Sequence, residues 1–457
     1  MNLLDPLFRS QAVDRIFSNR ATLQAMLDFE AALARAEARA GFIPSIAAPA
    51  IEAKCRAELY DMTILARSAG KAGNLAIPLV KQLTLLVAQK DKEAARYVHW
   101  GATSQDAIDT GRVLQLHQAL ALISTELDLF AVVLAELVHK HRATLIAART
   151  WMQQALPTTF GLKLAGWLDA IDRHRARLAE TQVRCLVLQF GGAVGTMAAL
   201  GARGLDIAAN LAKELKLPLP ELPWHSHRDR VAEIATTLGL CTGTLGKIAR
   251  DISLHMQTEV GEVFEPSAEG RGGSSTLPHK RNPVTCAIVL SAATRVPPLV
   301  STMLSAMVQE QERGLGGWHA EWETLPDIVR LTAGALHHLT TTVSELEINS
   351  ERMRENLDVT RGLIFAEAVT MALAEKMPRT DAHELVQNAC VRAQSSRRDL
   401  RSVLAQDAIV KASLSAAELE RIFAPANYLG VADQFIDRVL ASNTVHRDQK
   451  KFPKNKK

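Results

Sequence analysis

Apolar residues recur at alternating steps of three and four along several long stretches of the chain. The clearest pattern runs through residues 113–137, and comparable patterns cover residues 160–188 and 231–252. This spacing puts the apolar side chains on one face of a helix, and its persistence over several heptads favours nearly parallel helix packing. The first pattern consists of Val113, Leu116, Leu120, Ile123, Leu127, Phe130, Leu134 and Leu137. The sequence therefore predicts a bundle of long helices.

Two further stretches extend the predicted bundle. Residues 324–346 carry a similar apolar seam, and residues 286–312 carry one that Pro297 and Pro298 interrupt. Because proline lacks a backbone N–H and clashes with the preceding helical turn, we expect this last helix to kink or break at the two prolines.

The long helices also carry apolar residues outside their seams. Such a wide apolar band needs cover on more than one side, which a bundle from one chain does not supply. We therefore expect a homo-oligomer in which the bundles of several copies pack together. In the first helix the additional residues are Leu114, Leu122, Leu129 and Val133.

Both ends of the chain carry shorter helical patterns. Glycine and proline are sparse, at 25 and 17 residues, and aromatic residues make up 5% of the chain, a composition that favours helix over strand. The sequence thus predicts an all-α protein in three parts. They are a small N-terminal helical domain over residues 1–105, a long central bundle over 106–349 and a small C-terminal helical domain over 350–445.

The positive charge of the chain is concentrated in a C-terminal tail. The formal net charge is +4, and residues 446–457 alone carry six Lys or Arg against one Asp, or +5. We expect this tail to be disordered. Since the rest of the chain is close to neutral, the sequence argues against nucleic acid as a partner.

Other features exclude several classes of protein. No stretch reaches the ~18 uninterrupted apolar residues of a membrane span, and Asp5 and Arg9 do not fit a signal peptide. Five scattered cysteines, without a Cys-x-x-Cys, argue against a disulfide framework. His225 and His227 form a close pair without a third ligand at useful spacing, which disfavours a metal site. We expect a cytoplasmic protein with no membrane partner and no metal.

The segment most suggestive of chemistry is residues 265–284, EPSAEGRGGSSTLPHKRNPV. It separates two helical patterns and has no periodicity of its own, and long loops of this kind in compact domains are usually functional or disordered. Its serines, Lys280, Arg281 and Asn282 supply hydroxyls, cations and an amide, which can hold a carboxylate and move a proton. A flexible surface loop is the competing interpretation.

A second polar segment covers residues 97–110. Thr103 and Ser104 stand where a helix begins, and free N–H groups at a helix N-terminus bind anions. Thr103 followed by Asp106 is equally a helix capping box. His99 is either a ligand contact or a packed histidine.

A third, weaker segment places polar residues just before Pro157, which we expect near the first turn of a helix. Its polar residues include Arg149, Thr150 and Gln154. Weaker still is the segment of residues 224–230, WHSHRDR, which contains Arg228.

Residues 273–283, GSSTLPHKRNP, resemble the signature loop of the fumarase/aspartase superfamily, with Leu277 in place of the usual Met. Residues 103–106 and 149–150 resemble two further regions of that superfamily. The resemblance implies a three-domain, all-α fold and a homotetramer whose active sites draw these regions from three different subunits. It also implies a small carboxylate substrate and no cofactor.

Two departures from the superfamily pattern narrow the expected chemistry. Trp151 stands where its lyases have a histidine, and Ala287 where they usually have the glutamate that pairs with it. A chain without this acid–base pair should be poor at expelling an amine. The resemblance therefore favours the lactone-forming branch, in which a carboxylate of a tricarboxylate substrate adds across its own C=C bond. An adenylosuccinate lyase-like enzyme and a catalytically silent relative are the alternatives.

The resemblance also implies roles for individual residues. Ser274 would donate the proton to carbon, with Lys280 as a rival donor, and Trp151 could fill the space left by the missing histidine. The residues expected to bind substrate are His99, Thr103, Ser104, Arg149, Thr150, Trp151, Gln154, Arg228, Ser275 and Asn282.

Overall fold

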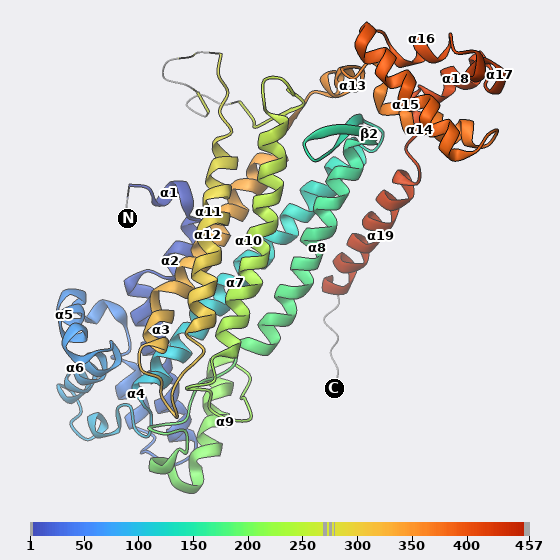
Figure 1. Cartoon of the computed structure of the whole chain (residues 1–457). Coiled ribbons are helices and arrows are strands. Elements are labelled where there is room, and N and C mark those ends of the chain that lie inside the picture. Colours follow the sequence, from blue (N-terminus) through green and yellow to red (C-terminus); the bar gives the residue numbers. More distant parts are fainter. Residues whose placement is uncertain (1–2, 268–271, 274–276, 278, 452–457) are drawn as a thin grey trace. The chain divides into compact units, whose positions relative to one another are not determined.

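The computed structural model describes residues 3–267, 272–273, 277 and 279–451, with side chains as far as Asn443. It divides into two compact units, each built mainly from helices (Figure 1), which confirms the predicted all-α class. The first unit comprises Met1–Leu127, His174–Gly246 and Ile288–His338, and the second Asp128–Arg173, Lys247–Ala287 and Leu339–Lys457. Because this division cuts across the long helices, the three-domain layout stays a prediction.

Five long helices occupy the central part of the chain. They are α7 (Ser104–Lys140), α8 (Phe160–Cys185), α10 (Asp229–His255), α11 (Val284–Ser305) and α12 (Gly317–Ser344). The seam predicted for α7 is at most 3% exposed from Val113 to Leu134. Leu122 and Leu129, outside the seam, are 41% and 50% exposed in the single chain. The apolar periodicity thus located the long helices correctly.

Within the first unit, α10 packs against three of the other long helices. The Oγ1 atoms of Thr242 and Thr332 lie 2.8 Å apart and join α10 to α12. His174 Nε2 in α8 lies 2.7 Å from Thr244 Oγ1. A Cβ atom at Gly246 would lie 2.6 Å from the Cβ of Ala293, so the absence of a side chain brings α10 close to α11.

The two prolines do not break α11, contrary to the expected interruption. Pro297 and Pro298 lie inside one helix that runs from Val284 to Ser305. Val296 and Met303, on either side of them, are at most 2% exposed, and their burial supports the helix where proline removes backbone hydrogen bonds. Among the described residues, α11 is also the one helix long and apolar enough to cross a membrane by length and composition alone.

Shorter helices complete the first unit. They are α1 (Asp5–Phe8), α2 (Gln11–Ile16), α3 (Asn19–Arg39), α4 (Ala47–Glu52), α5 (Met62–Ala72), α6 (Ala76–Ala88) and α9 (Gly204–Leu215), with the 3-10 helices η1 (Ala57–Leu59), η2 (Ala94–Tyr97) and η3 (Ala198–Arg203). Helix α3 is the most deeply buried of these, and it packs against α4 and α9.

The second unit contains a β-hairpin that the sequence pattern did not predict. Strands β1 (Leu145–Thr150) and β2 (Gln153–Thr159) pair antiparallel, with an irregularity between Ala147 and Arg149. Pro157, expected near a helix start, instead pairs with Ala147 in this ladder, and α8 begins only at Phe160. A two-stranded ladder tolerates proline because each strand has an edge that needs no N–H donor.

A second short ladder and a group of small helices complete the second unit. The strands are β3 (Val263–Phe264) and β4 (Glu347–Ile348); the helices are α13 (Ser350–Asp358), η4 (Leu363–Phe365), α14 (Ala366–Ala374), α15 (Arg379–Ser396), α16 (Leu400–Leu404), α17 (Ala408–Ser413), α18 (Ala416–Ile422), η5 (Pro425–Asn427) and α19 (Ala432–Lys451). The tail predicted to be disordered from residue 446 therefore begins inside a helix, and residues 452–457 lie outside the described part.

Candidate active site

The predicted site residues fall into both units. His99, Thr103, Ser104 and Arg228 belong to the first, and Arg149, Thr150, Trp151, Gln154, Lys280 and Asn282 to the second. Ser274 and Ser275 lie outside the described residues, as does Arg271. Each group is therefore described within its own unit.

In the first unit, Asp106 organises the start of α7. Its Oδ2 accepts the backbone N–H of Thr103 at 3.0 Å, which is the carboxylate half of the predicted capping box. The same carboxylate accepts the backbone N–H groups of Gly191 and Gly192, at 3.1 and 2.9 Å, and lies 2.8 Å from His225 Nε2. These contacts fix the first turn of α7, where the half-buried side chains of Thr103 and Ser104 stand.

His99 precedes this turn and is held by a buried carboxylate. Its Nδ1 lies 2.6 Å from Glu30 Oε1, and the two side chains are 14% and 1% exposed. Burial lowers the pKa of the imidazole, but the negative charges of Glu30 and Asp106 outweigh it and raise the pKa above 6.5. The histidine is thus more cationic at neutral pH than an ordinary one.

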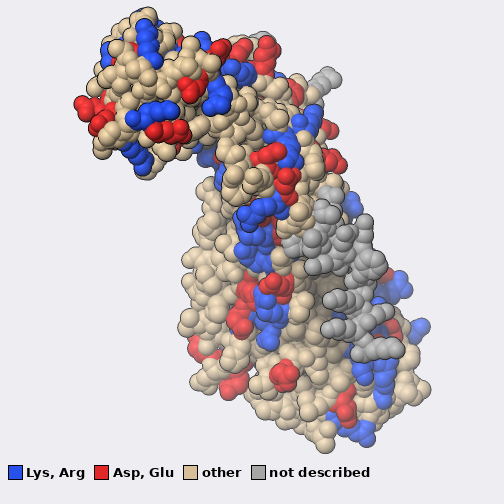
Figure 2. Space-filling model, turned by 90° about the vertical axis from the view of Figure 1, so that its right-hand side faces the viewer, with Lys and Arg blue, Asp and Glu red and all other residues tan. Residues whose placement is uncertain are grey.

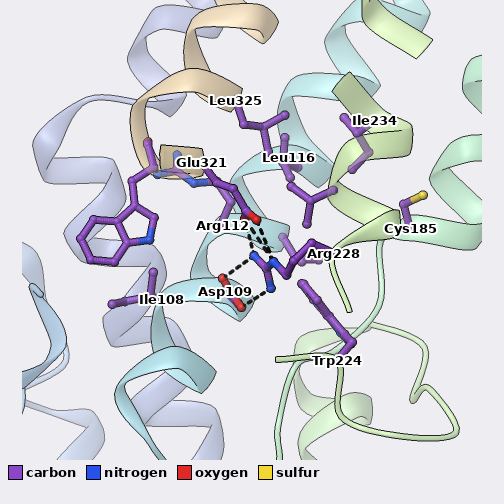
Figure 3. A pocket seen from close by; sticks show the side chains of 13 residues that line it. Ile108, Asp109, Arg112, Leu116, Cys185, Trp224, Arg228, Ile234, Glu321 and Leu325 are labelled. Atoms are coloured by element: carbon purple, nitrogen blue, oxygen red, sulfur yellow. Dashed lines mark hydrogen bonds and ion pairs between the residues drawn. The ribbon is translucent and has the colours of Figure 1, made fainter. Parts of the chain in front are cut away.

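The guanidinium of Arg228 is held by two carboxylates of the same chain. Its guanidinium donates to both carboxylate oxygens of Asp109, at 2.7 and 3.1 Å, and its Nε donates to Glu321 at 2.9 Å (Figure 3). The adjoining cavity has a volume of about 20 Å³, which holds about one water molecule. Arg228 is therefore a buried link between helices in the single chain, and its predicted contact with substrate stays a prediction.

In the second unit, the hairpin presents Trp151 at a strained turn. Thr150 pairs with Gln153, so Trp151 and Met152 form a two-residue turn, and their φ angles are 51° and 66°. Glycine and asparagine usually occupy such turns, and other residues there cost about 1–3 kcal/mol each. The Trp151 side chain is 97% exposed in the single chain. It therefore fills no space within its own subunit, and its expected place in a site shared between subunits stays a prediction.

Arg149 is also neutralised within the chain. Its Nη1 and Nη2 donate to the two carboxylate oxygens of Glu262 at 2.9 and 2.7 Å. Glu262 also lies 2.7 Å from His255 Nδ1 and accepts from Asn356 Nδ2 at 2.8 Å. Burial raises the pKa of Glu262, but these hydrogen bonds and the charge of Arg149 outweigh it and lower the pKa to about 2. Arg149 is thus less a free cation than a support for the hairpin.

The neighbouring hairpin residues are more accessible to a ligand. Thr150 is exposed at the end of β1. Gln154 is half-buried, and its Oε1 has no hydrogen-bond partner among the described residues.

The described part of the signature loop is tied to β4 and to α11. Arg281 forms an ion pair with Glu347 at 2.9 Å, so it is not the free cation expected from the sequence. The carboxylate of Glu265 accepts the N–H groups of Thr285 and Cys286, at 3.0 and 2.8 Å, and so caps α11. Within this frame Lys280 is exposed.

Asn282 closes the base of the loop, since its backbone N–H donates to Gly272 O at 2.8 Å. Ala287, at the position of the missing glutamate, is exposed in the first turn of α11.

The remaining predictions concern metal and charge. No group of three or more His, Cys, Asp or Glu side chains in the described residues could hold a metal ion. Figure 2 shows Lys and Arg interspersed with Asp and Glu on the face that it displays, without a broad patch of one sign.

The carboxylates that hold the site residues were not predicted. Glu30, Glu262 and Glu321 lie 69, 113 and 93 residues from the side chains that they bind. Glu30 is one of several charged residues in α3, so its charge alone did not mark it in the sequence.

The fold and these regions are those of a lyase, and the chain belongs to the lyase family of the fumarase/aspartase superfamily, as the signature loop predicted. A family model described as "Lyase" matches residues 9–297, and one described as "Adenylosuccinate lyase C-terminus" matches residues 362–439.

Individual relatives are similar over nearly the whole chain. The 3-carboxy-cis,cis-muconate cycloisomerases of Pseudomonas aeruginosa and Bradyrhizobium diazoefficiens are 57% and 52% identical to it, over 96% of this chain and 96% and 98% of theirs. The crystal structure of 3-carboxy-cis,cis-muconate lactonizing enzyme from Pseudomonas putida superposes with a TM-score of 0.93 at 53% identity, covering 97% of this chain and 99% of that one.

Proposed function

We propose that the chain is a cycloisomerase that converts 3-carboxy-cis,cis-muconate into 4-carboxymuconolactone, in the protocatechuate branch of the β-ketoadipate pathway. The observation that carries this proposal is the 57% identity, over 96% of both chains, to a cycloisomerase of that name. The paired departures at Trp151 and Ala287 support it independently, because a chain without the histidine–glutamate pair lacks the acid that an amine leaving group needs.

The reaction is an internal addition. A carboxylate oxygen of the substrate attacks one carbon of a C=C bond and forms the C–O bond of the lactone ring. The π electron pair moves to the neighbouring carbon, where the adjacent carboxylate holds it as an aci-carboxylate. A proton delivered to that carbon completes the product, so no cofactor is required.

The proposed roles follow the superfamily regions. Ser274 delivers the proton, with Lys280 lowering the local cost of negative charge or acting as the donor itself. Lys280, Asn282 and Ser275 hold the carboxylate that becomes the aci-carboxylate. The second carboxylate meets Thr103, Ser104, Thr150 and His99, with Gln154 as a further contact. In this scheme Arg149 supports the hairpin.

We further propose a cytoplasmic homotetramer whose sites combine regions from different subunits. The 97% exposure of Trp151 and the exposed apolar residues outside the α7 seam support this, since both need cover that the single chain does not give. Sedimentation at micromolar concentration should give about four times 49.8 kDa, and a monomer mass would contradict the shared site.

One assay tests the activity directly. Purified chain is incubated with 3-carboxy-cis,cis-muconate, and loss of the conjugated-diene absorbance is followed without added cofactor. We expect rapid loss and formation of the lactone. No loss here, together with release of fumarate from adenylosuccinate, would replace the proposal with a lyase activity.

Substitution of Ser274 tests the proton donor. Ser274→Ala should reduce kcat by about 10²–10⁴-fold, the usual contribution of general acid catalysis. The matched control is Ser267→Ala, an exposed serine of the same segment, which should leave kcat unchanged. Near wild-type activity of Ser274→Ala would assign the proton to another group, and Lys280→Met would then be examined first.

A further inference from the structure

Glu30 is a buried carboxylate that the proposed reaction does not use. It lies in α3, where Leu27, Phe29 and Leu33 are also buried, and it is 1% exposed. Burial of a carboxylate is costly unless a partner compensates its charge. Its Oε1 lies 2.6 Å from His99 Nδ1, and its Oε2 has no partner among the described residues. His99 is therefore the cation that this carboxylate contacts directly.

The backbone at His99 indicates that the imidazole is held in a defined place. Its φ is 58°, in the left-handed region that residues other than glycine rarely enter. Gly101, two residues on, has a φ of 69°, and a Cβ atom there would lie 2.4 Å from Leu200 Cδ2. The segment between η2 and α7 thus has little freedom, and the contact with Glu30 offsets part of its strain.

Four further acidic groups interact with the Glu30–His99 pair, and most of them are uncharged. They are Glu37, Cys55, Tyr60 and Asp106. Glu37, seven residues further along α3, is fully buried, and burial and the charge of Glu30 raise its pKa to about 9. Burial also raises the pKa of the Cys55 thiol and of the Tyr60 phenol. These three groups are uncharged at neutral pH. Glu30, and more weakly Asp106, are the anions that act on His99.

We propose that Glu30 is a positioning residue that fixes the tautomer and the charge of His99. With Nδ1–H donated to Glu30, the nitrogen left to meet a ligand is Nε2, which carries a proton when the ring is an imidazolium. That N–H is a charge-assisted donor for a carboxylate of the substrate. The assignment of a substrate to His99 rests on the proposed function, whereas the coupling of Glu30 to His99 does not.

The coupling is tested on the protein without substrate. Hydrogen–deuterium exchange at the C2 carbon of histidine, read by peptide mass spectrometry across pH, gives the pKa of His99 in the full chain. In Glu30→Gln we expect this pKa to fall by about one unit or more, because the amide carries no charge. The matched control is Glu37→Gln, the same change on the same helix, which should leave the pKa of His99 unchanged. An unchanged pKa in Glu30→Gln would overturn the proposal.

The consequence for catalysis is tested by the pH profile of kcat/KM. In the wild type, binding by the imidazolium is lost as the pH rises through the pKa of His99. In Glu30→Gln this alkaline limb should move to lower pH, with kcat/KM at pH 8 reduced about tenfold and most of the loss in KM. A uniform reduction without a moved limb would indicate a structural role and contradict the proposal.

A double-mutant cycle covers the case in which Glu30→Gln is poorly folded. His99→Gln alone should abolish the alkaline limb, and adding Glu30→Asp or Glu30→Gln to it should have no further effect on kcat/KM. A further loss of fivefold or more would mean that Glu30 acts other than through His99. If the wild type itself fails to turn over the muconate, the proposed function fails while the exchange result still decides the coupling.

Discussion

Two histidine–glutamate pairs with almost the same geometry have imidazoles whose pKa values are shifted in opposite directions. In the first unit His99 Nδ1 lies 2.6 Å from Glu30, and in the second unit His255 Nδ1 lies 2.7 Å from Glu262. Burial lowers the pKa of both histidines. The pKa of His99 nevertheless ends above 6.5, and that of His255 ends below it.

The difference lies in what else each carboxylate binds. Glu262 is shared with Arg149 and Asn356, and the positive charges of Lys163 and Arg149 act against a proton on His255. Among the described residues, Glu30 has no hydrogen-bond partner besides His99. A short contact with a carboxylate therefore does not set the charge of a histidine; the competition for that carboxylate does. The first pair thus favours the imidazolium form of its histidine, and the second favours the neutral ring.

The largest expected effect comes from removing the shared carboxylate. Glu262→Gln leaves Arg149 without its bidentate partner and His255 without its acceptor. Loss of one member of a buried ion pair typically costs about 3–5 kcal/mol in the free energy of unfolding. Urea denaturation should show this loss, and Glu259→Gln, an exposed glutamate three residues earlier, should show none. An unchanged free energy of unfolding in Glu262→Gln would contradict the role of Glu262 as the shared partner of Arg149 and His255.

The next effect concerns Glu37, whose neutrality leaves Glu30 as the charged partner. Between pH 4.5 and about 9 the unfolded chain loses this proton and the folded chain keeps it, so Glu37 lowers stability as the pH rises. Glu37→Gln removes that slope. The difference in free energy of unfolding between Glu37→Gln and the wild type should therefore grow by about 2–3 kcal/mol, in favour of the variant, from pH 5 to pH 7. Parallel stability curves for the two proteins would show that Glu37 is ionised.

A smaller effect should follow from freeing Glu262 of its competing cation. In Arg149→Gln the carboxylate has His255 as its remaining charged partner, and one opposing charge is gone. The pKa of His255 should rise by about one unit and approach the behaviour of His99. Histidine C2 exchange measures this value, with Arg352→Gln as a control, since that arginine binds the backbone of residues 259 and 260 instead. A fall in the pKa would contradict the competition argument.

Much of the fold could be predicted from the sequence because long helices repeat their signal many times. The seam from Val113 to Leu134 gave α7, and the signature at 273–283 gave the family. The hairpin was missed, because two six- to seven-residue strands offer too few repeats and Pro157 suggested a helix start. The prolines of α11 were misjudged because burial on both sides of them was not visible locally.

The site was predictable in its residue types but not in their charges. Arg149, Arg228 and Arg281 were identified as cations near the chemistry, and each is neutralised by a glutamate or aspartate distant in sequence. Glu30, which holds His99, is likewise distant in sequence. The tertiary fold brings these partners together, and no spacing in the sequence predicts them.

The central claim is that the pKa of His99 is raised and the pKa of His255 is lowered although both contact a glutamate. Histidine C2 exchange on the unmodified protein measures both pKa values in one pH series. The account predicts a pKa above 6.5 for His99 and below 6.5 for His255. Two values on the same side of 6.5, or the reverse order, would contradict it.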